Sequence, residues 1–166
     1  MGWSETISID THFSNYILSD NSIVRILIYD TAGQERFRKT VENFYKGADA
    51  IILIYDICYI DSFESCKNYY CETIKKYCKD TIKVMLIGNK TDLEYQRKIS
   101  FEEAHDFAFL NEYTHMETSC LRNENVYEAF EKVIEMTSIE KKKEKEKEKE
   151  KEKENQLKEL KKKGCI

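Results

Sequence analysis

The sequence DTAGQERF, residues 30–37, decides the fold of this 166-residue chain. The apolar run Ile23–Tyr29 leads directly into it and is predicted to be a buried strand. A carboxylate at the end of such a strand can hold magnesium through water, and Gly33 lets backbone N–H groups approach a phosphate oxygen. Gln34 then stands where an attacking water would need to be oriented. An ordinary strand-to-loop turn also uses Asp and Gly, but it does not account for so many specified residues in a row.

The charge distribution indicates an acidic folded region followed by a basic tail. Residues 140–163 contain twelve Lys and eight Glu, which leaves a net charge of −8 on the remainder against −4 for the whole chain. A nucleic-acid-binding protein would carry its basic patch on the folded part, so no nucleic-acid partner is expected. A basic tail instead suits a protein held near an anionic membrane surface. We therefore expect a folded domain over residues 1–139 and a charged tail over residues 140–166.

Apolar runs and polar turns alternate along the chain as they do in an α/β protein. An antiparallel hairpin is predicted from strands at 13–18 and 23–29, and further buried strands at 50–55, 82–87 and 114–117. Helices are expected at 62–79 with Ser62 as the cap, at 101–111 with Ser100 as the cap, and at 126–139. This alternation predicts a three-layer fold with a mostly parallel sheet. Ligands of such folds bind at the carboxyl ends of the strands, where Asp30, Asn89 and Ser119 fall.

The tail, the apolar runs and the cysteines indicate a protein without a coiled-coil tail, a membrane span, a secretory signal or a common zinc site. In the Lys-Glu alternation of residues 143–154, like charges recur at i,i+4 and unlike charges at i,i+3, so we expect a frayed helix or disorder. No apolar run is long enough to span a membrane, and no secretory signal is visible. The six cysteines include no C-x-x-C pair and fit no common zinc pattern, which favours reduced, cytosolic packing residues.

Two further segments follow predicted strands and carry polar side chains. In Asn89-Lys90-Thr91-Asp92, the Asp92 carboxylate can accept two hydrogen bonds from the N1–H and amino groups of guanine, a match that adenine cannot offer. The Lys90 stem can lie along the base, and the Asn89 amide can brace the loop. The second segment, residues 117–121, has the sequence Glu-Thr-Ser-Cys-Leu.

These motifs resemble those of the Ras superfamily of small GTPases, over about residues 6–136. DTAGQERF is similar to their second switch, and Phe44-Tyr45-Lys46-Gly47-Ala48 is similar to the Rab branch. The segment from Thr6 to Asp10 resembles the first switch, whose Thr coordinates magnesium when the third phosphate is present. Residues 89–92 resemble the N-K-x-D motif that selects guanine. Residues 117–121 look like the E-T-S-A-K element that closes over the base.

Some positions depart from the pattern of this family. Cys120 replaces Ala, which is tolerable because the Ala contributes mainly a backbone N–H. Leu121 replaces a Lys that would stack on the base, so binding of the base should be weaker. Thr11 and Tyr29 stand where Rab proteins usually have the Phe and Trp of an aromatic triad for effectors, whose other member corresponds to the Phe44-Tyr45 pair.

The resemblance implies a GTP-binding switch between GDP and GTP states that hydrolyses GTP and acts in vesicle transport. The catalytic residue would be Gln34, and Mg²⁺ would be held by Thr6 and Asp30. The residues expected around the nucleotide are Thr6, Asp30, Gly33, Asn89, Lys90, Asp92, Ser119 and Cys120. Expected partners are Rab effectors, exchange factors and GTPase-activating proteins. Lipidation of Cys165, as in prenylated Rab proteins, would place the protein on the cytosolic face of an endomembrane.

One motif of this family is not in the sequence. No G-x-x-x-x-G-K-[ST] occurs, although in the family this loop precedes the first switch and supplies the N–H cradle, the Lys charge and a magnesium ligand for the phosphates. We therefore expect an N-terminally truncated domain without its first strand, phosphate loop and first helix. A gap of about 9–10 Å, two strand spacings, should then separate residues 23–29 from 50–55.

Two structural outcomes and three functions stay open. Either the neighbouring strands close the gap, or the domain is unstable alone because strand edges face an apolar interior. The functional alternative to a GTPase is a nucleotide-free pseudo-GTPase, a binding module that engages Rab regulators or effectors through residues 36–45. A third reading is a charged interaction protein that acts through its Lys-Glu tail.

Overall fold

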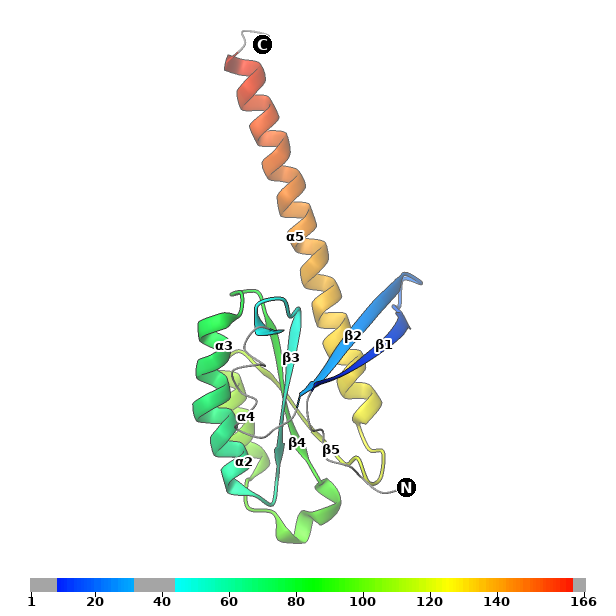
Figure 1. Cartoon of the computed structure of the whole chain (residues 1–166), viewed down its shortest axis with the longest axis vertical. Helices are drawn as coiled ribbons and strands as arrows, with labels where there is room; N and C mark the ends of the chain where they lie inside the picture. The colour runs from blue at the N-terminus through cyan, green and yellow to red at the C-terminus, as the bar shows by residue number, and fades with distance from the viewer. Residues whose placement is uncertain (1–8, 32–43, 163–166) are drawn as a thin grey trace.

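The computed structural model describes residues 9–31 and 44–162, and the strands in these ranges form two separate sheets (Figure 1). The antiparallel pair consists of β1 (Ile9–Ile17) and β2 (Ile23–Thr31). The parallel sheet contains β3 (Ala50–Asp56), β4 (Lys83–Asn89) and β5 (Thr114–Thr118), in the order β3-β4-β5. The predicted hairpin and the predicted α/β fold are confirmed.

Helices connect the strands of the parallel sheet, and a last helix, α5, follows β5. The first connection is one helical stretch made of α2 (Ile60–Ser65), the π-helical turn η2 (Cys66–Tyr70) and α3 (Cys71–Tyr77). The others are the 3₁₀ segment η3 (Thr91–Gln96), α4 (Phe101–Leu110) and α5 (Val126–Lys162). The Ser100 cap is confirmed, because its Oγ accepts from the N–H of Glu103 at 3.0 Å. The Ser62 cap is wrong: α2 begins earlier, and the Ser62 hydroxyl donates to the Tyr59 carbonyl at 2.6 Å.

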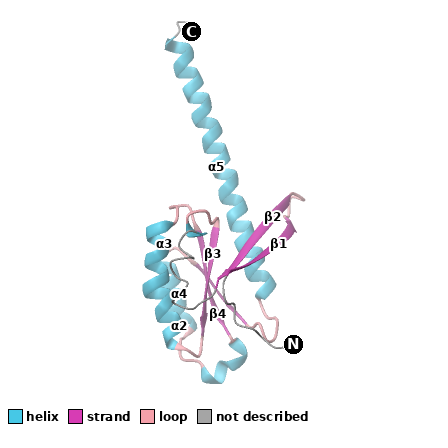
Figure 2. Ribbon diagram, in the orientation of Figure 1, coloured by secondary structure: helices cyan, strands magenta, loops and turns pink. Residues whose placement is uncertain are grey.

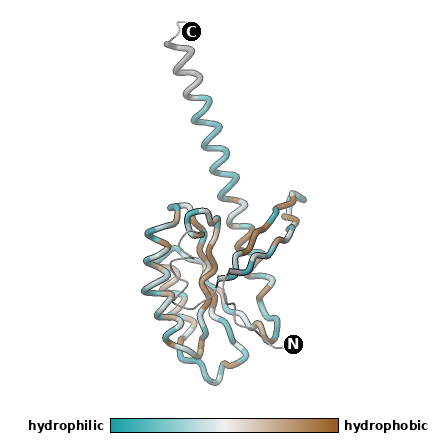
Figure 3. Tube along the Cα trace, in the orientation of Figure 1, coloured by the Kyte–Doolittle hydropathy of each residue, from teal (hydrophilic) through white to brown (hydrophobic). Residues whose placement is uncertain are grey.

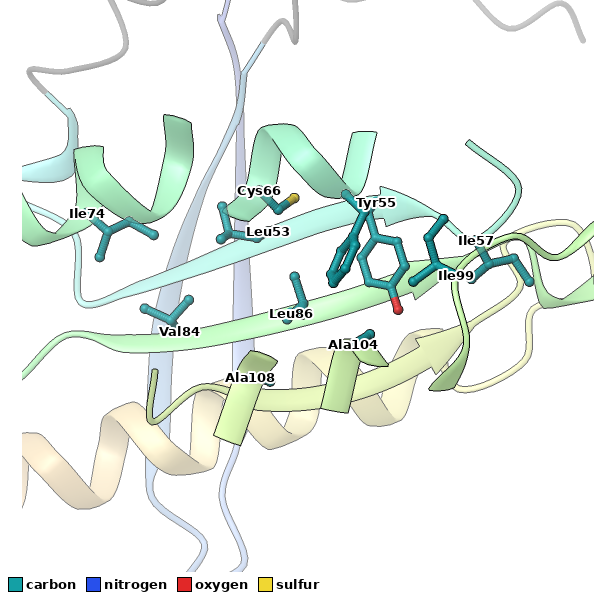
Figure 4. Close-up of a cluster of buried hydrophobic side chains, with 11 residues drawn as sticks. Leu53, Tyr55, Ile57, Cys66, Ile74, Val84, Leu86, Ile99, Ala104 and Ala108 are labelled. Atoms are coloured by element: carbon teal, nitrogen blue, oxygen red, sulfur yellow. The ribbon is translucent and has the colours of Figure 1, made fainter. Parts of the chain in front are cut away.

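Side chains of the parallel sheet alternate between two buried layers, and Figure 4 shows the first of them. Leu53, Tyr55, Val84 and Leu86 face α2, η2, α3 and α4, where they meet Phe63, Cys66, Ile74, Ala104 and Ala108. Met85 and Ile87 point to the other face and pack against Ala129 and Val133 of α5. Helices therefore cover both faces of the sheet (Figure 2). This double burial accounts for the apolar run of residues 50–55 apart from Ile54, which is 60% exposed.

The hairpin and the parallel sheet are not hydrogen-bonded to each other in the described part of the chain. Of the two structural outcomes left open by the sequence, closure of the gap by pairing of β2 with β3 is therefore the one that the structure contradicts. α5 connects the two sheets instead: it packs on β4 and β5, and it contacts the hairpin through the hydrogen bond from the Tyr16 hydroxyl to Glu131. A second contact is the 2.6 Å ion pair between Lys142 and Asp20.

The tail does not fray after residue 139, contrary to the expectation from its charge pattern. α5 is one helix of 37 residues that projects from the domain, and Figure 3 shows the coloured turns beyond the domain as hydrophilic. Polar contacts hold its root: Lys83 pairs with Glu140 at 2.8 Å, Lys141 pairs with Asp49 at 2.6 Å, and Thr81 donates to Glu144 at 3.0 Å. Lys and Glu also have high intrinsic helix propensity. The helix α5 thus continues without a break across the predicted boundary between residues 1–139 and residues 140–166. No helix within the described ranges is both long and apolar enough to cross a bilayer.

Candidate functional site

The predicted base-recognition residues lie together at the carboxyl ends of β4 and β5. Parallel pairing sets Asn89 opposite Thr118, so the loops that follow these two strands emerge side by side. The Ser119 hydroxyl donates to Asp92 Oδ1 at 2.6 Å and accepts from the N–H of Arg122 at 3.1 Å. Ser119 is completely buried, so this bond fixes the position of the Asp92 carboxylate.

Asn89 joins the two loops from the other side. Its Oδ1 accepts from the Thr118 hydroxyl at 3.2 Å and from the backbone N–H of Cys120 at 3.3 Å. The loop after β5 is closed further by backbone bonds in both directions between Ser119 and Glu124, at 3.0 and 3.1 Å. Asn89 therefore braces the loop that carries Ser119 and Cys120.

Lys90 makes a contact that the sequence did not suggest. It adopts the left-handed conformation, with φ of 73°, and its Nζ lies 2.6 Å from Asp56 Oδ2. The hydrogen bond to Asp56 raises the pKa of Lys90. Partial burial favours the neutral form of Asp56, but the bonds from Lys90 and from the N–H of Cys58 outweigh burial and hold the pKa of Asp56 below its usual value. Asp56 ends β3, so its place at the carboxyl end of a predicted strand was the signal that could have identified it.

Arg97 links the two loops and was also missed, because nothing local in the sequence marks it. It forms bidentate bonds to Glu117 at 2.7 and 2.8 Å and to Glu94 at 2.7 and 2.8 Å, and it donates to the Ile99 carbonyl at 3.0 Å. These bonds use all five N–H donors of the guanidinium. Glu94 follows Asp92 by two positions, and Glu117 precedes Ser119 by two. The carboxylates, Glu117 first, raise the pKa of Arg97.

The chemistry available at this edge is that of a fixed hydrogen-bond acceptor. A carboxylate can accept about four hydrogen bonds, so the single bond from Ser119 leaves Asp92 able to accept a pair of donors from a ligand. Leu121, which stands where the resemblance places a stacking Lys, is 78% exposed and does not pack into this cluster.

The phosphate and magnesium residues are described only in part. Asp30 lies near the end of β2, whereas Asn89 ends β4 in the other sheet and Ser119 follows β5 of that sheet. Four predicted residues lie outside the described ranges: Thr6, Gly33, Gln34 and Cys165. Tyr29 and Phe44, two positions of the expected aromatic triad, have ring centroids 4.7 Å apart. Within residues 9–31 and 44–162 no group of three His, Cys, Asp or Glu side chains could hold a metal.

The side chain of His115, a residue of β5, packs against α4. Its Nε2 lies 3.2 Å from the Tyr55 hydroxyl, its ring centroid lies 4.9 Å from that of Phe101, and its Nδ1 is buried without a partner among the described residues. Burial lowers the pKa of His115, although Glu117 opposes this shift. The folded state therefore favours the neutral imidazole.

Stability is accordingly expected to fall as the pH drops below about 6.5, the pKa of an unfolded His, because only the unfolded chain gains the proton there. The contribution is fully present above that pH and is lost on the acidic side. Urea unfolding between pH 5 and 8 measures it. His115→Gln should flatten this pH dependence, whereas His12→Gln, at an exposed position on β1, is the control. An unchanged slope in His115→Gln contradicts the prediction.

Comparisons with known proteins agree with this architecture. The model of the Ras family matches residues 2–139. The chain is 39% identical to the GTP-binding protein ypt3 of Schizosaccharomyces pombe over 129 residues, which are 78% of this chain and 59% of that protein. It is 40% identical to Ras-related protein Rab-4A of Danio rerio over 124 residues, 74% of this chain and 58% of the relative. It is 37% identical to Ras-related protein RabC of Dictyostelium discoideum over 112 residues, 68% of this chain and 57% of the relative.

The α/β architecture, with a three-stranded parallel sheet and helices on both faces, is consistent with the small-GTPase fold. The chain belongs to the Ras family, and its relatives place it in the Rab branch. It spans about three fifths of the length of the curated relatives that it matches.

Proposed function

We propose that this chain is a Rab-like small GTPase domain that switches between GDP and GTP states in membrane traffic. The observation that carries the proposal is the cluster at the ends of β4 and β5, where Ser119 holds the Asp92 carboxylate and Asn89 braces the adjoining loop. Paired donors on one edge of a ligand match that carboxylate, and guanine presents such a pair. Lys90 and Cys120 complete the contacts to the base.

The phosphate half of the nucleotide depends on other residues. Asp30 and Thr6 would hold Mg²⁺, and the Gly33 backbone would approach a phosphate. A metal held by these residues would supply positive charge against the charge that develops on the phosphates during phosphoryl transfer. Gln34 orients the attacking water. These roles rest on the family resemblance and on the position of Asp30 at the carboxyl end of β2.

The tail would attach the protein to the cytosolic face of an endomembrane. A lipid on Cys165 and the basic cluster Lys161–Lys163 supply the two signals that stable anchoring requires. The part of α5 from residue 140 to its end at Lys162 is about 35 Å long at 1.5 Å per residue, so it would act as a spacer between membrane and domain. Effectors, exchange factors and GTPase-activating proteins would then reach the switch residues.

Base selectivity tests the proposal through Asp92. The protein for this test is an extended chain, with an N-terminal strand–loop–helix segment that carries G-x-x-x-x-G-K-[ST]. It should prefer GDP to ADP, and Asp92→Ala should weaken GDP binding about 10- to 100-fold, the value of one bidentate base contact. ADP affinity should stay nearly constant, so the preference disappears. Asp106→Ala, an exposed carboxylate on α4, is the matched control and should change neither affinity.

A second candidate function follows from the sequence, which contains no phosphate-loop motif. A pseudo-GTPase module would bind Rab regulators or effectors through residues 36–45 without nucleotide. If the extended chain folds but does not prefer guanine, and the original chain still binds a Rab exchange factor, the module is the better description.

A further inference from the structure

The β1–β2 hairpin has one face packed toward α5 and one face exposed. Tyr16 and Leu18 are on the packed side, where Leu18 is buried and Tyr16 bonds to Glu131. The side chains of the opposite face include Phe13 and Ile17, each 64% exposed, and Ile23, 71% exposed. Cross-strand partners on this face include Phe13 with Leu27 and Ile17 with Ile23. So much exposed apolar surface on a small hairpin indicates an interaction site.

The outer edge of β1 is open among the described strands, since β1 pairs only with β2 (Figure 2). The N–H of Leu18 donates to Ser22 at 2.9 Å, which makes residues 18 and 22 a hydrogen-bonded pair. Hydrogen-bonded and non-hydrogen-bonded pairs alternate along an antiparallel ladder. The backbone groups of Thr11, Phe13, Asn15 and Ile17 therefore point away from β2, toward the open edge.

The sequence of β1 carries none of the usual protection against pairing. Exposed edge strands commonly contain Lys, Pro or a bulge that blocks a further strand. β1 has the sequence IDTHFSNYI, with no Lys, Arg or Pro in its nine residues, and Asp10 is its one acidic residue. Its register with β2 runs from Ile9 to Ile17 without interruption. A strand of this length and composition is a template for another strand.

We propose that β1 pairs antiparallel with β1 of a second copy of this chain, about a two-fold axis at Phe13. Phe13 is the middle residue of the strand, so this register uses its whole length. Thr11 lies opposite Asn15, and both have outward-pointing backbone groups, as a hydrogen-bonded pair requires. The two hairpins join into one four-stranded sheet.

The charges of β1 fit a second copy in this register. Asp10 lies opposite Tyr16, so the two acidic residues of the paired β1 strands are not opposite each other. Arg25 belongs to β2, an outer strand of the joined sheet, and its guanidinium lies over the Phe13 ring of its own chain, 5.3 Å from the ring centroid. The exposed apolar face becomes continuous across the two hairpins, since the Phe13 rings are adjacent. One strand from each partner buries less than the roughly 800 Å² per partner of a standard interface, so the dimer should be weak, on the order of micromolar.

Sedimentation equilibrium of the full chain tests this pairing between about 1 and 200 µM, a range chosen around the expected affinity. The weight-average mass should rise from 19.8 kDa toward twice that value. Two double variants then test the register. Thr11→Lys with Asn15→Glu places opposite charges across the interface, whereas Thr11→Glu with Asn15→Glu places like charges there. Their dimer dissociation constants should differ at least about tenfold, with the first variant tighter.

Comparison of the two double variants distinguishes an effect of charge across the proposed β1–β1 pairing from an effect on the folding of the hairpin. Thr11 and Asn15 are both exposed, and the Asn15→Glu change, which places a carboxylate opposite Arg25 within the hairpin, is common to both variants. Thermal unfolding of each variant checks that the hairpin is intact. A chain that stays monomeric throughout the range overturns the proposal. So do equal dissociation constants in the two variants, because they place the dimer contact on another surface.

Discussion

Replacing Arg97 with leucine is expected to lower the free energy of unfolding by about 2–3 kcal/mol. This value lies between the cost of losing one charge-assisted hydrogen bond and the cost of removing one partner of a fully buried ion pair. The Arg97 and Glu117 side chains are only 17% and 14% exposed. Without the guanidinium, the Glu117 carboxylate stays in that environment and loses both of its bonds. The Ile99 carbonyl loses a donor as well.

The effect should be visible as a decrease of roughly 5–10 °C in the midpoint of thermal unfolding for a chain of this size. Arg122→Leu is the matched control, because Arg122 and Glu124 lie 3.9 Å apart and are more than half exposed. Such surface pairs contribute at most about 1 kcal/mol. Similar shifts in both variants would mean that Arg97 is an ordinary surface residue and does not hold the loops of residues 89–97 and 117–120 together.

The elements of the parallel sheet could be predicted because their signal is local. Residues 50–55 and 84–87 are continuous apolar runs, a pattern typical of strands that are covered on both faces. Because parallel strands end at a common edge, the strand assignments alone predict that Asn89 and Ser119 lie close together. The candidate base site was predictable to the extent that it depends on strand ends.

Contacts between distant parts of the chain could not be predicted from local patterns. Arg97 reaches Glu117 across twenty positions, and Lys90 reaches Asp56 across the helical stretch α2, η2 and α3 and the strand β4. The helical tail shows the same limit. Its charge pattern predicts weak local support, but the bonds of Glu140 to Lys83 and of Lys141 to Asp49 depend on where α5 docks. Local rules gave the wrong end for α5 because tertiary contacts stabilise the turns that follow residue 139.

The chain of 166 residues is expected to bind GDP and GTP negligibly at micromolar concentrations, even with Mg²⁺ present. Phosphate contacts provide most of the affinity for a nucleotide through charge-assisted bonds, each worth about 1.5–3 kcal/mol. The cluster of Asn89, Asp92 and Ser119 can contribute the choice of base but not those bonds. The extended chain, with its G-x-x-x-x-G-K-[ST] segment, should bind both nucleotides at least about 1,000-fold more tightly, which corresponds to a few such bonds.

Titration of fluorescent guanine nucleotides against both proteins measures this difference. A version of the extended chain in which the motif lysine is replaced by alanine separates completion of the sheet from binding of the phosphates. It should fold like the extended chain and bind guanine nucleotides markedly less tightly.

In the extended chain, Gln34→Leu should slow GTP hydrolysis in single-turnover assays and leave GTP affinity nearly unchanged, because Gln34 would orient water and not the nucleotide. Tight guanine nucleotide binding by the unextended chain would contradict the prediction, since other residues would then have to hold the phosphates.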